Sequence, residues 1–197
     1  MTAVATPTEV FDFAGTDSTQ RTAKTSLVTT LIEKTTQMIE DYIGRYIIPQ
    51  LATIKIHNGR YCSIAYDKIY LDSKYYDPYS ISELKEDDVI LTEDTDFVKT
   101  KPNILERIDE PWSQTDQLNI EITGYFGMGY SAVVSEETVY YPHKGLKEIL
   151  IEAVAVQANI WSRIVDDGSG NSFEIMRNSL PNFSKDSLYA YRQRPVL

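Results

Sequence analysis

The segment IEITGYFGMGY (residues 120–130) is followed by Tyr141-Pro142 and a mostly apolar run from Leu146 to Ile164. Apolar and polar residues alternate before the glycines, which predicts a strand that ends in a bulge or a tight turn. The apolar run predicts a long helix that is buried on more than one side. The helix residues that we expect to pack in the core or between subunits are Leu146, Leu150, Val154 and Trp161.

The bulk composition predicts one soluble domain with additional arms. The chain has 197 residues, 42% of them hydrophobic, and its fourteen tyrosines are a residue type favoured at interfaces. A single cysteine, Cys62, excludes an intrachain disulfide and a cysteine-rich metal site. We see neither a signal peptide nor an apolar run of the ~18 residues that a membrane span needs. We therefore expect synthesis in a reducing cytosol and no membrane partner.

A first helix is expected from Ser26 to about Ile47, capped by Thr25 or Ser26 and stopped by Pro49. Residues 1–24 show little periodicity and are expected to form a flexible arm, in which the aromatic side chains Phe11 and Phe13 dock on a neighbour. The region from residue 25 to residue 165 is then the folded core.

The middle of the chain is rich in strand patterns. Asn58-Gly59 lies between two alternating segments, residues 53–57 and 60–64, and so predicts a type I′ hairpin. The short connections between the strands predict mostly antiparallel pairing. We expect an α+β fold: a helical bundle of two long helices and a C-terminal segment, carrying an antiparallel β-rich lobe. Further strands are expected at Lys68–Leu71, Ile81–Leu84, Val89–Leu91, Phe97–Thr100, Ile104–Ile108 and Leu118–Thr123.

Negative charge is concentrated in this β-rich lobe. The formal net charge is -10, and thirteen acidic residues lie between Asp67 and Glu110. Such a charge argues against a general nucleic-acid binder, because phosphate contacts need Lys and Arg. An acidic surface can nevertheless face DNA without adhering to it. The candidate acidic surface consists of Glu86, Asp87, Asp88, Glu93, Asp94 and Asp96.

The sequence contains no convincing catalytic, metal or cofactor motif. His57 and His143 are better explained by surface or capping roles. Asp94-Thr95-Asp96 begins like a calcium loop, but Lys99 and Leu105 occupy the positions that need Gly and Glu. The glycines of residues 124–129 lack a Walker ending and a dinucleotide spacing. We therefore expect no catalytic residue, no metal, no cofactor and no enzymatic activity.

Residues 166–197 are expected to form a docking tail. A flexible break at Asp166–Asn171 precedes apolar and basic side chains that lie outside the expected core. Such a segment is typical of one that orders on a partner. The residues of the expected docking surface are Phe173, Ile175, Met176, Leu180, Phe183, Leu188, Tyr189, Tyr191 and Arg192.

Six short sequence motifs follow one another along the chain. They are residues 39–46, 89–97, 120–130, 142–147, 153–161 and 183–192. Together they resemble the head–tail connector proteins of long-tailed bacteriophages, also called head completion or adaptor proteins. The resemblance covers roughly residues 26–192. Two features depart from it: Tyr141-Pro142 replaces the family's double proline, and the N-terminal arm is longer.

The resemblance implies a structural role in the virion neck, after synthesis in the host cytoplasm. The chain would form a homo-oligomeric ring, expected to be a dodecamer of about twelve subunits, closed by one repeated contact. The ring would lie beneath the capsid portal protein, prolong the DNA channel without tight DNA binding, and carry the next neck or tail-completion protein. The tail would dock on the portal. Two alternatives remain: an acidic, non-enzymatic protein-binding module outside phages, and an enzyme that uses Asp94 and Asp96.

Overall fold

The structure is a computed structural model that describes residues 4–56, 62–65, 67–71, 75, 77–101, 103–112, 120–167 and 180–192. The chain divides into two compact units. A helical unit comprises Met1–Ile47 and Ser131–Leu197, and a β unit comprises Ile48–Tyr130. The described part is α+β, as the sequence predicts, and the strand pairing within its sheets is antiparallel.

The prediction of a flexible N-terminal arm is wrong for the described residues from position 4 onward. Helix α1 (Pro7–Ala14) begins with a capping box, in which Glu9 N donates to Thr6 Oγ1 over 3.3 Å and Thr6 N donates to Glu9 Oε2 over 2.9 Å. The helix ends at Gly15, whose φ is 63°. Phe11 is buried against the helical unit, whereas Phe13 is 61% exposed. Local capping and one buried aromatic side chain therefore order this segment.

Helix α2 (Ser18–Ile43) begins earlier in the chain than the predicted start at Ser26. Asp17 caps it, because its Oδ1 accepts hydrogen bonds from Thr19 N and Gln20 N at 2.9 and 3.0 Å. The helix ends at Gly44, which adopts the left-handed conformation with φ 73°, before Pro49 is reached. The expected cap at Thr25 or Ser26 is thus wrong, since both residues lie inside the helix.

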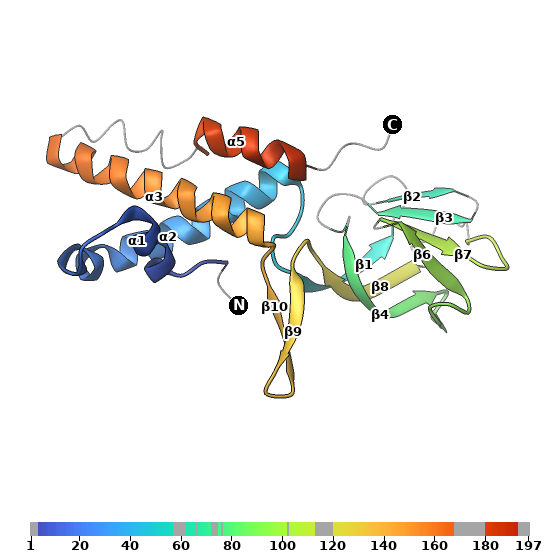
Figure 1. The fold of residues 1–197 in the computed structure, drawn as a ribbon. Coiled ribbons are helices and arrows are strands. Elements are labelled where there is room, and N and C mark those ends of the chain that lie inside the picture. The colour runs from blue at the N-terminus through green and yellow to red at the C-terminus, as the bar shows by residue number, and fades with distance from the viewer. Residues whose placement is uncertain are drawn as a thin grey trace. The chain divides into compact units, whose positions relative to one another are not determined.

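Helix α3 (Lys144–Asp167) packs against α2. Leu146, Leu150 and Val154 are fully buried, and Thr35 Oγ1 donates to Gln157 Oε1 over 3.2 Å in the same interface. The side chain of Trp161 lies outside the described residues. The helical unit is completed by helix α5 (Asn182–Leu188), the 3-10 turn η2 (Tyr189–Tyr191), and a hairpin of β9 (Tyr130–Val134) and β10 (Glu137–Tyr141) (Figure 1). No helix of the described part is long and apolar enough to cross a membrane.

In the part of the β unit that the structure describes, the strands form two four-stranded sheets. In the first sheet the order is β1-β8-β4-β5, and in the second it is β2-β3-β7-β6. The strands are β1 (Gln50–Ile56), β2 (Cys62–Ala65), β3 (Lys68–Leu71), β4 (Pro78–Glu86), β5 (Val89–Leu91), β6 (Phe97–Lys101), β7 (Ile104–Arg107) and β8 (Ile120–Phe126).

The hairpin expected at Asn58-Gly59 is not formed by the described strands on either side of it. Strand β1 pairs with β8, and β2 pairs with β3 in the other sheet. The pairing of β1 places Ile54 opposite Ile122 and Ile56 opposite Ile120, and all four side chains are buried. Burial of these cross-strand pairs holds β1 in the first sheet. Residues 57–61, which include His57, lie outside the described part.

Glycines allow β8 to pass close to its neighbours. A Cβ atom on Gly124 would overlap the carbonyl oxygen of Ser80 in β4. Gly127 has φ 146°, and its N–H donates to Asp77 O over 2.9 Å where the chain leaves the sheet. Strand β8 therefore continues to Phe126, beyond the predicted end at Thr123, and the predicted tight turn begins only at Gly127.

Candidate docking and channel surfaces

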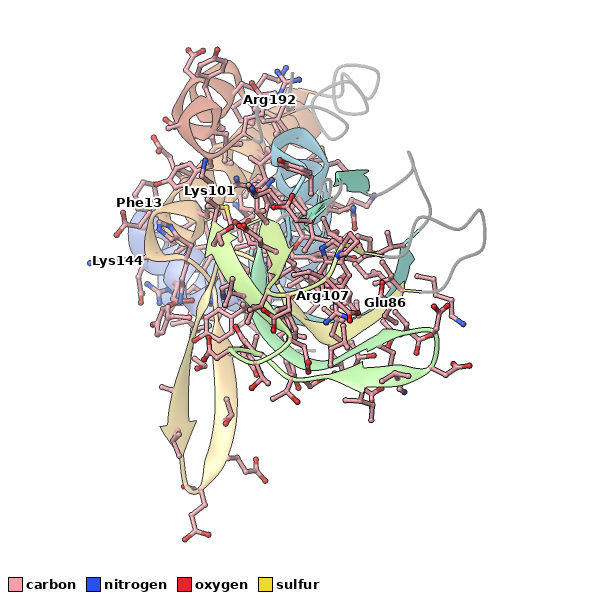
Figure 2. The ribbon with its side chains drawn as sticks, turned by 90° about the vertical axis from the view of Figure 1, so that its right-hand side faces the viewer. Phe13, Glu86, Lys101, Arg107, Lys144 and Arg192 are labelled. Atoms are coloured by element: carbon pink, nitrogen blue, oxygen red, sulfur yellow. The ribbon has the colours of Figure 1, made fainter. Side chains whose placement is uncertain are left out.

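Glu86 does not belong to an open acidic surface. Its Oε2 atom lies 3.2 Å from Nη2 of Arg107, and the two side chains are 11% and 12% exposed. Because Glu86 is in β4 and Arg107 is in β7, this ion pair joins the two sheets of the β unit, as Figure 2 shows. The prediction that Glu86 lines a channel is corrected, since its charge is neutralised inside the unit.

Arg107 is held by further partners. Its Nη1 atom donates to Asp96 O over 3.2 Å, and its guanidinium lies 5.5 Å from the centre of the Trp112 ring. Trp112 is buried, and its Nε1 donates to Asp67 O over 2.9 Å. A cation above an aromatic ring is stabilised by the ring's electron density. These contacts form a structural cluster rather than a binding site.

Asp96 also has a structural role. Its Oδ2 atom accepts a hydrogen bond of 2.7 Å from Thr92 N, and its own N–H donates to Thr92 O over 2.8 Å. This pairing closes the turn between β5 and β6, in which Asp94 has φ 66°. Asp and Asn tolerate the left-handed region better than most residues. The turn geometry therefore accounts for the acidic residue types of Asp94 and Asp96.

Four of the six predicted acidic side chains are exposed: Asp87, Asp88, Glu93 and Asp94. Asp87 and Asp88 form the turn between β4 and β5, with φ values of 50° and 64°. Between the two acidic turns runs the edge strand β5, where Val89 is 62% exposed and Ile90 is 61% exposed. The exposure of this apolar strip was not predicted from the sequence. Within the described ranges, no group of three or more His, Cys, Asp and Glu residues could hold a metal ion.

The C-terminal segment packs on its own chain, contrary to the expectation that it lies outside the core. Leu188 is fully buried and Leu180 is 6% exposed. The Tyr191 ring contacts the His143 ring edge-on at 5.4 Å, and the Arg192 guanidinium lies 5.4 Å from the Tyr42 ring. Apolar burial on α2 and α3 therefore orders this segment within the monomer.

Part of the expected docking surface remains accessible. Tyr189 is 65% exposed, and Arg192 is exposed at the end of the described chain. Phe173, Ile175 and Met176 lie outside the described residues, as does the side chain of Phe183. His143 lies just before α3, where its carbonyl oxygen accepts a 3.0 Å hydrogen bond from Lys147 N, in agreement with the expected role at a helix start.

An ion pair between Glu9 and Lys147 joins α1 to α3. The Oε1 and Nζ atoms are 2.6 Å apart. Burial raises the pKa of the Glu9 carboxyl, but the hydrogen bonds and charge of Lys147, with further hydrogen bonds from Thr6, lower the pKa below its ordinary value. This contact was not predicted from the sequence, although the Thr6-to-Glu9 spacing is a capping-box pattern.

The β9–β10 hairpin was also missed, because its turn has no glycine or asparagine. Ser135 and Glu136 occupy the turn with φ values of 51° and 70°. Val133 is 75% exposed and Val134 is 47% exposed. Enrichment of β-branched and aromatic residues on both sides of Ser135-Glu136 is the signal that could have identified these strands.

No family model, curated protein or solved structure matches the chain. The fold is that of an α+β protein in which an antiparallel β unit is inserted into the sequence of a helical unit.

Proposed function

We propose that the chain is a structural virion protein of a long-tailed bacteriophage. It forms a homo-oligomeric ring beneath the capsid portal, extends the DNA channel, and joins the head to the neck or tail. The observation that carries this proposal is the insertion of the β unit, Ile48–Tyr130, between the two parts of one helical unit. The resemblance to connector proteins implies this order of helix, β lobe and helix.

In this proposal α2, α3 and the C-terminal segment are the helical bundle, and the β unit is the lobe that the bundle carries. Three observations support the assignment. The two long helices share a buried interface that contains the hydrogen bond from Thr35 to Gln157. Leu188 is buried between the C-terminal segment and these helices. Tyr42 of α2 also donates a 3.5 Å hydrogen bond to Lys185 O of α5.

The exposed acids Asp87, Asp88, Glu93 and Asp94 are the channel-facing group in this proposal. Fixed negative charge repels the phosphate backbone, so that DNA passes without being gripped. Glu86 and Asp96 do not belong to this channel-facing group, because Glu86 is paired with Arg107 and Asp96 closes a turn.

The C-terminal segment docks on the portal through its accessible side chains. Leu180 and Leu188 anchor the segment on its own helices, while Tyr189 is exposed and Arg192 is accessible beside the Tyr42 ring. Aromatic and Arg side chains are enriched among residues that dominate the free energy of binding at interfaces.

Co-sedimentation with the portal ring of the same phage tests this proposal. The wild-type chain should sediment with the portal, and a Tyr189→Ser, Arg192→Ser variant should bind at least tenfold more weakly. The matched control is Asp186→Asn, an exposed change in the neighbouring helix α5 that should bind normally. A wild-type chain that never sediments with the portal contradicts the proposal.

The exposed β5 edge favours a second candidate, an acidic protein-binding module. Val89 and Ile90 lie between two acidic turns, a surface suited to an extended basic peptide that adds a strand to the sheet. In that case the chain stays monomeric with the portal and binds a Lys-rich β-forming peptide, and Val89→Asp abolishes that binding. Peptide binding that Val89→Asp leaves unchanged excludes this candidate.

A further inference from the structure

The β9–β10 hairpin is a two-stranded sheet with exposed apolar side chains on both faces. Val133 and Val134 are consecutive in β9, so they point to opposite faces of the ribbon, and they are 75% and 47% exposed. Within the described residues, these two strands pair only with each other. Because an isolated two-stranded hairpin is only marginally stable in water, three or more strands are usually needed. The hairpin is therefore incomplete as a sheet.

The turn of the hairpin is strained. Ser135 and Glu136 have φ values of 51° and 70°, in a region that favours glycine and that Ser and Glu rarely adopt. Such backbone conformations persist where the surrounding structure holds them. A further strand along the hairpin would supply this support.

Strand β9 is the edge of the hairpin that is suited to receive a further strand. Residues Tyr130–Val134 include no charged side chain, whereas β10 begins with Glu137. Charged side chains on an edge strand oppose pairing with another chain, and β9 lacks this protection. Figure 1 shows the hairpin extending away from the helices of its own unit, and Val133 and Val134 are exposed near its tip.

We infer that β9 pairs with β9 of a second copy, antiparallel and about a two-fold axis at Val133. Val133 then lies opposite Val133 of the second copy, and Ala132 lies opposite Val134 on either side of the axis. Cross-strand pairs of apolar side chains stabilise a sheet. The four strands follow the order β10-β9-β9-β10, so the pairing supplies the additional strands that a lone hairpin lacks.

The acidic tips do not oppose this pairing. Glu136 and Glu137 are adjacent and exposed, but antiparallel pairing sends the two tips to opposite ends of the four-stranded sheet. Each Glu136 lies three positions from the axis, so the two are roughly 20 Å apart at about 3.4 Å per residue. Charges at that separation are largely screened at physiological salt, where the Debye length is about 8 Å. Two chains of net charge -10 thus meet through an uncharged strand.

Two other described sheet edges fit β9 less well. Strand β5 lies between acidic turns that have the same sign of charge as the hairpin tip. At β6, Lys99 Nζ donates to Pro78 O over 3.2 Å, and Phe97 O accepts a 2.8 Å hydrogen bond from Asp94 N. The edge of β6 is therefore already engaged within its own unit.

The same strand meets itself in this contact, so the contact is closed and yields a dimer rather than a ring. It is separate from the ring contact of the proposed function and goes beyond that function, because it pairs free chains. The central ladder uses only Ala132, Val133 and Val134 of each copy. Interfaces smaller than the standard size are usually weak, so we expect the dimer to form at high protein concentration.

Position 133 tests the axis directly, because its side chain faces the same position of the second copy. Val133→Asp alone opposes two carboxylates, and Val133→Lys alone opposes two ammonium groups, so each should weaken dimerisation at least tenfold in sedimentation equilibrium at low salt. An equal mixture places Asp opposite Lys and should restore dimers that contain one chain of each kind. A mixture that stays monomeric overturns the inference, as does a wild-type chain that stays monomeric at high concentration.

Val89 provides the matched control. It is 62% exposed on β5, so Val89→Asp and Val89→Lys make the same changes of charge at a similarly exposed valine and should each leave dimerisation unchanged. Circular dichroism should show wild-type folding for all four variants, because both valines are exposed. Equal loss of dimerisation at positions 89 and 133 overturns the inference, because no particular strand would then be responsible.

The outcome also distinguishes this pairing from the proposed function. If the chain binds the portal but never dimerises alone, the pairing fails and the connector function stands. If the chain dimerises through position 133 but never binds the portal, the pairing stands and the connector function fails. Loss of portal binding in Val133→Asp, with no dimer of the wild-type chain, would assign the hairpin to the portal contact and overturn the inference.

Discussion

Glu86 and Arg107 form an ion pair between the two sheets of the β unit, with Oε2 3.2 Å from Nη2 and nearly buried side chains. Arg107→Ala leaves the Glu86 carboxylate without this partner in a poorly solvated position. We expect this change to lower the free energy of unfolding by about 3 kcal/mol, because loss of one partner leaves a buried charge uncompensated. Urea denaturation measures the effect.

The control for this pair is Lys55→Ala, which removes the partly exposed pair with Glu121. It should cost less than about 1 kcal/mol, the usual range for a surface ion pair. Equal costs for the two changes would show that the Glu86–Arg107 pair is no more protected from solvent than the surface pair.

Leu188 anchors the C-terminal segment on the helical unit. Because the side chain is fully buried, Leu188→Ala should lower the free energy of unfolding by about 2–5 kcal/mol. Tyr189→Ala, at the exposed neighbouring position, should change it by less than about 0.5 kcal/mol. Thermal unfolding followed by circular dichroism compares the two, and an unchanged Leu188→Ala variant would mean that the segment detaches in solution.

Deletion of residues 180–197 should destabilise the helical unit, rather than leave a separate core intact. The deletion exposes the surface on α2 and α3 that Leu188 covers. The truncated chain should melt several degrees below the full chain. Identical melting temperatures would restore the view of an independent docking tail.

Gly124 lets β8 approach β4 closely. In Gly124→Ala the new Cβ overlaps the Ser80 carbonyl oxygen, so we expect a loss of about 1–3 kcal/mol from displacement of the strand. Gly15→Ala is the comparison, because its Cβ would enter open space and only the positive φ of Gly15 opposes it, at a cost of about 1 kcal/mol. Denaturation in urea should rank the two variants in that order, and the reverse order would contradict the close approach.

The pKa of Glu9 predicts a pH dependence of stability. Its pKa is lowered in the folded state, so the contribution is present above the unfolded value near 4.5 and is lost as pH falls through the lower folded pKa. Because the pair with Lys147 is partly exposed, the contribution should stay below about 1 kcal/mol. Glu9→Gln should therefore reduce stability at neutral pH and match the wild type once the pH lies below the folded-state pKa of Glu9. A variant that differs from the wild type by the same amount at both pH values would exclude this pair as the cause.

Local sequence patterns predicted those strands and helices whose boundaries depend mainly on neighbouring residues. Strands β3 and β5 have the predicted bounds, and α3 extends the predicted apolar helix by a few residues at each end. Asp17 and the Thr6-to-Glu9 capping box were available in the sequence, but α1 and the first turns of α2 were not predicted, because the apolar periodicity around these caps is low.

Long-range pairing could not be predicted from local patterns. The Asn58-Gly59 signal competes with the burial of Ile54 and Ile56 against β8, which lies more than sixty residues further along the chain. The pairing of Glu86 could not be predicted for the same reason. Nothing near Glu86 in the sequence indicates that Arg107 neutralises its charge.

Electron microscopy of the chain mixed with its portal ring tests the connector function most directly. The account predicts one added ring of about a dozen subunits on one face of the portal, with a continuous central channel. Portal particles without added density, together with a chain that remains monomeric by light scattering, would contradict it.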